Sequence, residues 1–223
     1  MNGKLFVKAL TRFLAGLVLF GLLLFLPAGT FRYPQGWLLV GVLFVPIFIM
    51  GIVLMIKNPE LLAKRLNARE KESEQRAVVL FSGIMFLAAF IMAGLSFRFG
   101  WLMLPFPVSI VAAVVFVSSY VLYAEVLREN TYLSRTIEVQ ENQKVIDTGL
   151  YGIVRHPMYM ATVILFLAMP LVLGSVISFV IMLCYIPIIV KRIRNEEQVL
   201  AKDLPGYEDY RKKVKHRLIP FIW

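Results

Sequence analysis

Polar residues divide this chain into long apolar runs. Runs without a charged residue occupy positions 13–31, 33–56, 77–97 and 99–124. Each is close to the ~20 residues that an α-helix needs to cross a bilayer. A further uncharged run, 157–190, is too long for one helix and suits two short helices folded back on each other, with Pro170, Gly174 and Ser175 as the break. The pattern predicts an all-α integral membrane protein with six transmembrane helices, the last two forming a tight helical hairpin.

The basic residues give this predicted bundle an orientation. With six helices both termini lie on one side, and that side receives every Lys and Arg except Arg32 and Arg98. Cytoplasmic loops of membrane proteins are enriched in Lys and Arg. We therefore expect a multi-pass protein whose N- and C-termini are both cytoplasmic.

Composition agrees with a membrane location. Hydrophobic residues make up 59% of the chain and charged residues only 17%, against about 25% in soluble domains. The net charge of +10 is then better explained by cationic loops facing anionic lipid than by nucleic-acid binding. The expected partner is the lipid bilayer, with no nucleic acid, and the oligomeric state is left open.

Three local features have simple interpretations. Cys184 is the only cysteine and lies in an apolar run, so we expect no disulfide, no zinc cluster and no metal site. The N-terminal stretch, with Lys4, Lys8 and Arg12 before a long apolar run, predicts a retained first helix and not a signal peptide. The segment 57–76 predicts an amphipathic surface helix with Leu61, Leu62 and Leu66 on one face.

The stretch YGIVRHPMY, at 151–159, opens the predicted hairpin. Pro157 suits the first turn of a helix, where its missing N–H costs nothing. Free backbone N–H groups at that start favour an anion, and Arg155 and His156 flank the position. The stretch is compatible with a pocket for a carboxylate, or else with an arginine that reaches lipid headgroups and a histidine that caps the helix.

The stretch KRIRNEEQVL, at 191–200, follows the second helix of the hairpin. Helical spacing places Glu197 on the same face as Ile189 and Ile193, so its carboxylate should face the protein and needs a cationic partner. Glu196 has a simpler explanation as an i,i+4 pair with Arg192. Because a hairpin returns the chain to the same side, we expect Arg155 and His156 to lie beside Glu196 and Glu197.

The last stretch, 205–223, carries Tyr207, Tyr210, a basic run and the apolar end LIPFIW. We expect the basic run at the lipid surface and the apolar end packed back on the membrane. Tyr207 either closes over a ligand or anchors at the interface.

These motifs, in this order and spacing, resemble the isoprenylcysteine carboxyl methyltransferase-like family of integral-membrane methyltransferases, which is related to the phospholipid N-methyltransferases. The resemblance covers TGLYGIVRHPMY, RNEEQVL, PGYEDYRKKV and LIPFIW, all within 125–223. It divides the chain into a four-helix transmembrane region at 1–124 and a catalytic region at 125–223. Ala161 departs from the family, which often has glycine there.

The resemblance implies S-adenosylmethionine as the methyl donor, S-adenosylhomocysteine as the product, and an enzyme of the EC 2.1.1 class. It places the donor in a cytoplasmic pocket between the last two helices and the C-terminal segment. By position, the residues implied to bind the cofactor are Gly149, Tyr151, Val154, His156, Pro157, Tyr159, Glu196, Glu197 and Tyr207. No G-x-G occurs in the chain, so the donor site of soluble Rossmann-type enzymes is not expected.

Our hypothesis for catalysis gives roles to two residues. Arg155 orients a carboxylate of the acceptor or donor, and Glu197 holds the donor ammonium. Methyl transfer needs no covalent enzyme intermediate, so alignment and exclusion of water are the main tasks. If the acceptor is an amine, Glu197 or His156 is the candidate to accept its proton.

The acceptor is the open part of this prediction. An isoprenylcysteine-type carboxylate, or a small hydrophobic thiol or acid, fits the expected lipophilic substrate. The alternatives are a phospholipid N-methyltransferase and a non-enzymatic membrane protein such as a transporter. Transporters usually carry polar residues near mid-membrane, and the first four apolar runs contain no charge.

Overall fold

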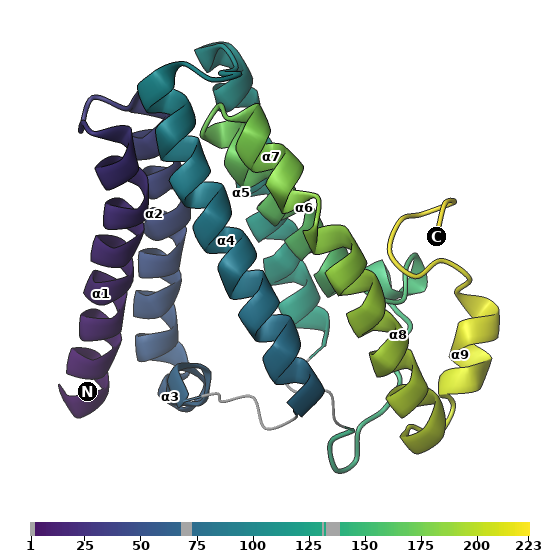
Figure 1. Ribbon diagram of the computed structural model, residues 1–223. Helices are drawn as coiled ribbons and strands as arrows, with labels where there is room; N and C mark the ends of the chain where they lie inside the picture. Colours follow the sequence, from purple (N-terminus) through teal and green to yellow (C-terminus); the bar gives the residue numbers. More distant parts are fainter. Residues whose placement is uncertain (1–2, 68–72, 131, 133–138) are drawn as a thin grey trace.

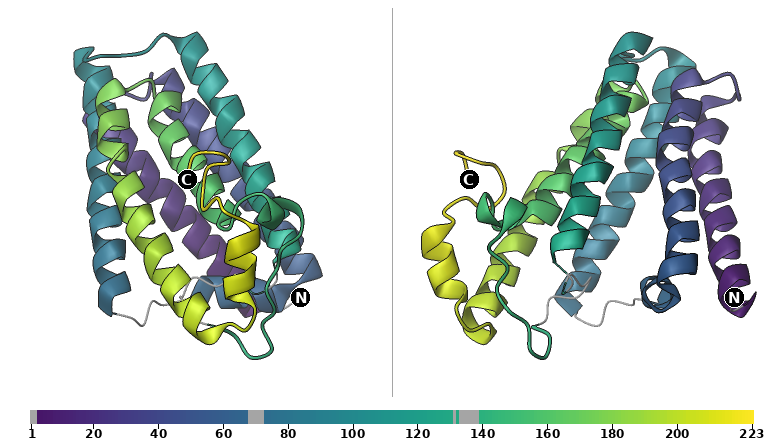
Figure 2. Two further views of the ribbon diagram at one scale, coloured as in Figure 1. Left: turned by 90° about the vertical axis from the view of Figure 1, so that its right-hand side faces the viewer. Right: turned by 180° about the vertical axis from the view of Figure 1, so that it is seen from behind.

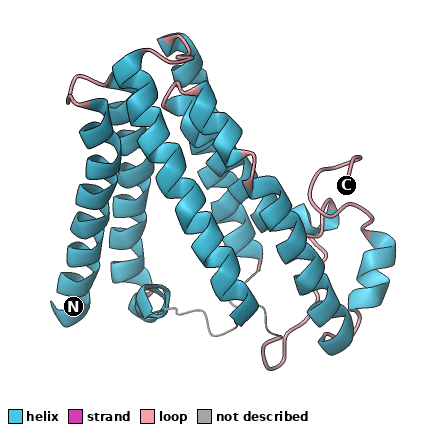
Figure 3. Cartoon of the chain, in the orientation of Figure 1, coloured by secondary structure: helices cyan, strands magenta, loops and turns pink. Residues whose placement is uncertain are grey.

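In the computed structural model, the residues described are 3–67, 73–130, 132 and 139–223. The helices in chain order are α1 (Gly3–Ala28), α2 (Pro34–Lys57), α3 (Pro59–Asn67), α4 (Ser73–Phe99), α5 (Phe106–Glu129), the 3-10 helix η1 (Gly149–Gly152), α6 (Pro157–Val172), α7 (Val176–Met182), α8 (Tyr185–Asp203) and α9 (Tyr207–Lys213). Helices are the only regular elements among these residues, apart from one isolated bridge between Met103 and Ser175 (Figure 3). The predicted all-α class is confirmed.

Five helical segments are long and apolar enough to cross a membrane. They are α1, α2, the part of α4 at Leu80–Phe99, α5, and the segment Val176–Asp203 that joins α7 to α8. The sixth expected helix is α6, whose 16 residues span roughly 24 Å, less than the ~30 Å hydrocarbon core. A multi-pass membrane protein is thus supported, while the count of six stays a prediction.

The predicted hairpin is formed by α6 and the α7–α8 segment (Figure 1). The chain reverses at 173–175, where Gly174 has φ of 71° and the Ser175 hydroxyl caps α7 by accepting from the Ser178 N–H. Pro170 lies in the last turn of α6, and its carbonyl accepts from the Ser175 N–H at 3.0 Å, so it takes part in the reversal from the helix side. A 2.7 Å bond from the Leu104 N–H to the Gly174 carbonyl also holds the turn.

The two ends of the bundle differ in charge, as the basic residues predict. Figure 1 shows the N-terminus, α3 and the far end of α8 at one end. The connections near Arg32 and Arg98 lie at the other end, after α1 and at the close of α4. The cationic segments therefore gather at one end of the molecule, which we call the basic end.

Helices α1 and α4 approach closely at Gly94. A Cβ at this position would lie 2.6 Å from the Leu24 carbonyl oxygen and 3.0 Å from the Ala28 N–H nitrogen. Small residues let helix backbones come this near within a membrane. Gly94 thus fixes the crossing that holds the α1–α2 hairpin to the rest of the bundle.

Replacing Gly94 by alanine is expected to lower the free energy of unfolding by about 1–3 kcal/mol, because the two backbones must separate. Unfolding in mixed micelles measures the change. Gly83→Ala on the same helix is the matched control, since no atom lies within 4 Å of a Cβ there. It should leave stability unchanged or raise it by about 0.5–1 kcal/mol. Equal effects at both positions would contradict the close crossing.

Beyond the bundle, α8 continues at the basic end and the chain folds back along it. Figure 2 shows α9 and the C-terminal segment beside α8, with the loop before η1 on the same side. Leu204, Tyr207, Tyr210 and Val214 form a small buried cluster there, covered by Val145 among others. This cluster packs separately from the apolar helices, and the candidate site lies between it and the start of α6.

Candidate functional site

A pocket opens at the basic end, between the start of α6, α8 and α9. Residues 143–146 cover one side. Its aromatic and charged lining residues are Tyr132, Tyr151, Tyr159, Tyr207, Tyr210, Lys144, Arg155, His156, Arg192 and Glu196.

The turn that precedes α6 is fixed by contacts from two other helices. Glu129, the last residue of α5, accepts a 3.1 Å hydrogen bond from the Leu150 N–H. The Tyr210 hydroxyl of α9 donates to the Tyr151 carbonyl at 2.8 Å. Gly149 has φ of 49°, and a Cβ on it would overlap the Glu129 carboxylate. The sequence TGLYG thus places Tyr151 in the pocket wall.

Gly149→Ala is expected to destabilise the protein by about 1–3 kcal/mol, because it adds both a strained φ and a clash with Glu129. Thermal unfolding in detergent measures this. Gly41→Ala, in a helix with no atom near its Cβ, is the control and should be neutral or stabilising. A neutral Gly149→Ala would mean that Glu129 does not hold the turn.

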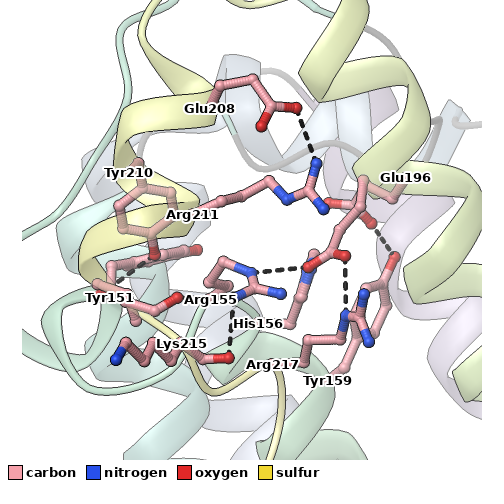
Figure 4. Close-up of polar contacts among 12 residues, drawn as sticks. Tyr151, Arg155, His156, Tyr159, Glu196, Glu208, Tyr210, Arg211, Lys215 and Arg217 are labelled. Carbon is pink, nitrogen blue, oxygen red and sulfur yellow. Dashed lines mark hydrogen bonds and ion pairs between the residues drawn. The ribbon is translucent and has the colours of Figure 1, made fainter.

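The sequence predicted that Arg155 and His156 lie beside the glutamate pair of α8, and this contact is confirmed at Glu197. Arg155 Nε donates to Glu197 Oε1 at 2.7 Å, and His156 Nε2 lies 3.3 Å from the same oxygen. The other carboxylate oxygen, Oε2, accepts from Arg217 Nε at 2.8 Å (Figure 4). Glu197 is 4% exposed, and Arg155 and His156 are also buried. The carboxylate is therefore held between two arginines inside the protein.

Arg155 also holds the returning C-terminal segment. Its Nη1 donates to the carbonyls of Val214 and Lys215 at 2.6 and 3.0 Å. The N–H groups of Arg155 and His156 donate to the His216 and Arg217 carbonyls at 2.9 and 2.8 Å. These two N–H groups, which flank the start of α6, are therefore engaged by carbonyls of 216–217. The anion expected at the free N–H groups of the first turn of α6 itself stays a prediction.

A second polar group does face the pocket. The Tyr159 hydroxyl donates to Glu196 Oε2 at 2.5 Å and accepts from Arg192 Nε at 2.9 Å. All three residues line the pocket. Glu196 and Arg192 therefore meet at the Tyr159 hydroxyl, and the expected pairing of these two charges is mediated by a residue of α6. This group offers one anionic and one cationic side chain to a ligand.

The pocket tyrosines are neutral hydrogen-bonding groups. Burial raises the pKa of Tyr151 to about 12 and raises the pKa of Tyr207 and Tyr210 above the ordinary value. Tyr207 is buried, and its hydroxyl has no hydrogen-bond partner among the described residues. A buried hydroxyl without a partner costs free energy. Because Tyr207 lines the pocket, its hydroxyl is a candidate partner for a ligand atom once the side chains that enclose it move.

The residues predicted from the sequence divide into two sets. Six line the pocket, namely Tyr151, Arg155, His156, Tyr159, Glu196 and Tyr207. Gly149, Val154, Pro157 and Glu197 are not in the lining; Pro157 is the first residue of α6, as expected. His156 is the N-cap of α6 but makes no capping bond with its side chain. Both oxygens of Glu197 accept from arginines, and the hypothesis that it holds a ligand ammonium stays a prediction.

Several pocket residues were missed by the sequence interpretation. Asn130 donates to the Tyr151 hydroxyl at 2.9 Å, and Lys144 and Tyr132 lie on the covering side. Arg192 was seen only as a partner of Glu196. No pattern in the sequence marks Arg217, because its contact with Glu197 depends on how the chain returns after α9. Among the described residues no three His, Cys, Asp or Glu side chains gather as a metal site would require.

Comparison with known proteins gives a family match that covers part of this region. The isoprenylcysteine carboxyl methyltransferase (ICMT) family matches residues 109–202. Delta(14)-sterol reductase TM7SF2 of Mus musculus is 31% identical over 91 residues, which are 40% of this chain and 22% of that protein. The matched part of the chain thus spans under a quarter of this curated relative. The resemblance to the isoprenylcysteine carboxyl methyltransferase family is therefore confirmed over residues 109–202, the stretch that carries Arg155, Tyr159 and both glutamates of α8.

Proposed function

We propose that this protein transfers a methyl group from S-adenosylmethionine to a lipophilic acceptor at the membrane. The observation that carries the proposal is the position of the polar pocket. Most of its lining residues fall in the region matched by a methyltransferase family, with Leu204, Tyr207 and Tyr210 just after it, and it opens at the basic end of an apolar helix bundle. In this proposal all six predicted helices cross the bilayer and both termini are cytoplasmic, so the donor enters from the cytoplasm.

The chemistry of the pocket fits such a donor. S-adenosylmethionine carries an ammonium, a carboxylate and a positively charged sulfur. Glu196 offers a carboxylate to the ammonium, and Arg192 offers a guanidinium to the carboxylate. Faces of tyrosine rings attract a cation by their quadrupole, and several tyrosines line the pocket. The unpartnered Tyr207 hydroxyl supplies one more hydrogen bond.

The bound donor would supply the electrophilic methyl group. The residues of the chain then have to orient the acceptor and exclude water. Arg155 and Glu197 act in this proposal as positioning residues, because they fasten 214–217 behind the pocket. A carboxylate or thiolate acceptor needs no base. For an amine acceptor, Glu196 is the carboxylate that lines the pocket and His156 the imidazole.

The proposed acceptor is an isoprenylcysteine-type carboxylate or a small hydrophobic thiol or acid. Calorimetric titration of the purified protein with S-adenosylmethionine tests the donor. Incubation of membranes with labelled donor, followed by separation of protein, lipid and volatile products, identifies the acceptor. Label on phospholipid headgroups would favour phospholipid N-methylation instead. Absence of binding at millimolar donor would refute the methyltransferase proposal.

A second candidate is reduction of a lipophilic substrate, favoured by the likeness to a sterol reductase over 91 residues. Such a reaction needs a hydride donor, for which a reduced nicotinamide dinucleotide is the ordinary choice. The same calorimetric experiment with this dinucleotide separates the two. Binding of the dinucleotide without binding of S-adenosylmethionine would support the reductase.

A further inference from the structure

Residues 218–223 form a compact loop whose two faces differ. The N–H groups of Leu218 and Ile219 donate to the Trp223 carbonyl at 2.8 and 3.0 Å, and the Trp223 N–H donates back to the Ile219 carbonyl at 3.1 Å. Leu218 is buried with Ile189 and Ile193 of α8, and Trp223 packs on the same cluster. One face of the loop is therefore fixed to the hairpin.

The other face is apolar and uncovered. Phe221 is 91% exposed and Ile222 is 77% exposed, and Ile219 beside them is also exposed. Phe221 has φ of 65°, a backbone conformation that is strained for a bulky residue. Such a conformation persists where the surrounding structure fixes it, and the hydrogen bonds between Ile219 and Trp223 fix it here. Two large apolar side chains held outward side by side on this loop indicate an apolar environment around them.

The position of the loop identifies that environment as lipid. Figures 1 and 2 show the C-terminal loop rising from α9 on the outer side of α8, away from the basic end, to a level about halfway along the bundle. The preceding residues are cationic: Lys212 and Lys215 are exposed, and Lys212 pairs with Asp209 at 2.8 Å. An apolar tip next to exposed lysines is the pattern of a segment that inserts between anionic headgroups.

The loop is connected to the pocket through Arg217. The guanidinium of Arg217 lies 5.4 Å from the centre of the Trp223 ring. Its Nε donates to Glu197, which in turn binds Arg155 of the pocket lining. The backbone of 216–217 also accepts from the N–H groups of Arg155 and His156. Displacement of the loop would therefore loosen the segment that backs the pocket.

We propose that Phe221 and Ile222 insert into an anionic lipid surface, and that this anchorage holds residues 214–217 against Arg155, His156 and Glu197. In this proposal, contact of the loop with lipid keeps residues 214–217 in place behind the pocket. The proposal is independent of the reaction that the pocket performs.

Insertion is tested by spin labelling in nanodiscs of phosphatidylcholine and phosphatidylglycerol. In a Cys184→Ser background, which removes the only cysteine, a nitroxide is attached at Phe221→Cys. Its accessibility to oxygen and to a water-soluble nickel complex is compared with labels at Val180→Cys, on an apolar helix, and at Lys212→Cys, on the exposed basic side. A label at 221 that behaves like that at 180 supports insertion. One that behaves like that at 212 overturns it.

The coupling is tested by hydrogen exchange in the same nanodiscs. The double variant Phe221→Ser, Ile222→Ser should speed exchange of the Arg155 and His156 amides at least about tenfold, because their acceptors are released. Val180→Ser is the control, at a 59% exposed apolar position, and should not change these amides. Purely zwitterionic nanodiscs should speed the same amides about fivefold. Unchanged exchange in the double variant would overturn the coupling, and unchanged exchange in zwitterionic lipid would overturn the role of anionic lipid.

Discussion

Replacing Glu197 by glutamine is expected to lower the free energy of unfolding by about 3 kcal/mol. Glu197 is buried and binds Arg155 at 2.7 Å and Arg217 at 2.8 Å. Glutamine keeps the size of the side chain but leaves two guanidinium groups without their shared countercharge. Uncompensated buried charge is among the most costly single changes in a protein. Arg217 is partly exposed and can turn to solvent, which is why we expect the lower end of the usual range.

Unfolding in mixed micelles measures this loss. Glu208→Gln is the matched control, because Glu208 pairs with Arg211 at 2.8 Å on the surface and exposed pairs contribute about 0–1 kcal/mol. A double-mutant cycle with Arg217→Gln should give a coupling above about 1 kcal/mol. If Glu197→Gln costs no more than Glu208→Gln, the carboxylate does not hold the C-terminal segment.

The hairpin, and the contact between Arg155 and Glu197 that follows from it, were predictable from the sequence. The uncharged run 157–190 is too long for one helix, so the chain had to return to the same end of the bundle. That reasoning brings Arg155 to Glu197 across a separation of 42 residues, and the structure places them in contact. It depends only on the length of apolar segments, which a bilayer fixes closely.

The roles of the two glutamates were not predictable in the same way. Helical periodicity correctly places Glu197 inward, and the structure has it 4% exposed. An inward side chain can face either a ligand pocket or the protein that backs it. Which of these holds depends on residues 214–217, whose path follows the turn at Gly206 with φ of 85°. Periodicity along α8 carries no information about a segment that returns from elsewhere.

The backbone just before α6 shows the same competition. Free N–H groups near a helix start can bind a ligand in isolation. Here the carbonyls of 216 and 217 accept from the N–H groups of Arg155 and His156. Polar groups in a largely apolar protein find partners within the chain wherever the backbone allows it. The groups left for a ligand are those that the chain does not satisfy, such as the Tyr207 hydroxyl.

Replacing Glu196 by glutamine is expected to weaken binding of S-adenosylmethionine about 10- to 150-fold, with little change in stability. Glu196 lines the pocket and is half-buried, so its carboxylate can approach the donor ammonium. Hydrogen bonds to a charged group contribute about 1.5–3 kcal/mol, which corresponds to this range of affinity. Glutamine still accepts from the Tyr159 hydroxyl, so the wall itself should keep its shape.

Calorimetric titration of Glu196→Gln, Glu197→Gln and Glu208→Gln, each at a temperature where the protein is folded, separates the two glutamates of α8. Glu208→Gln should bind the donor as the parent protein does. Glu197→Gln should lose mainly stability, because its carboxylate is enclosed by Arg155 and Arg217 and lies behind the pocket lining. Tyr159→Phe should weaken binding less than Glu196→Gln, since it removes the group that orients Glu196 and keeps the charge. Should Glu197→Gln abolish binding while Glu196→Gln retains it, the donor ammonium would belong at Glu197, and the two arginines would have to move aside to admit it.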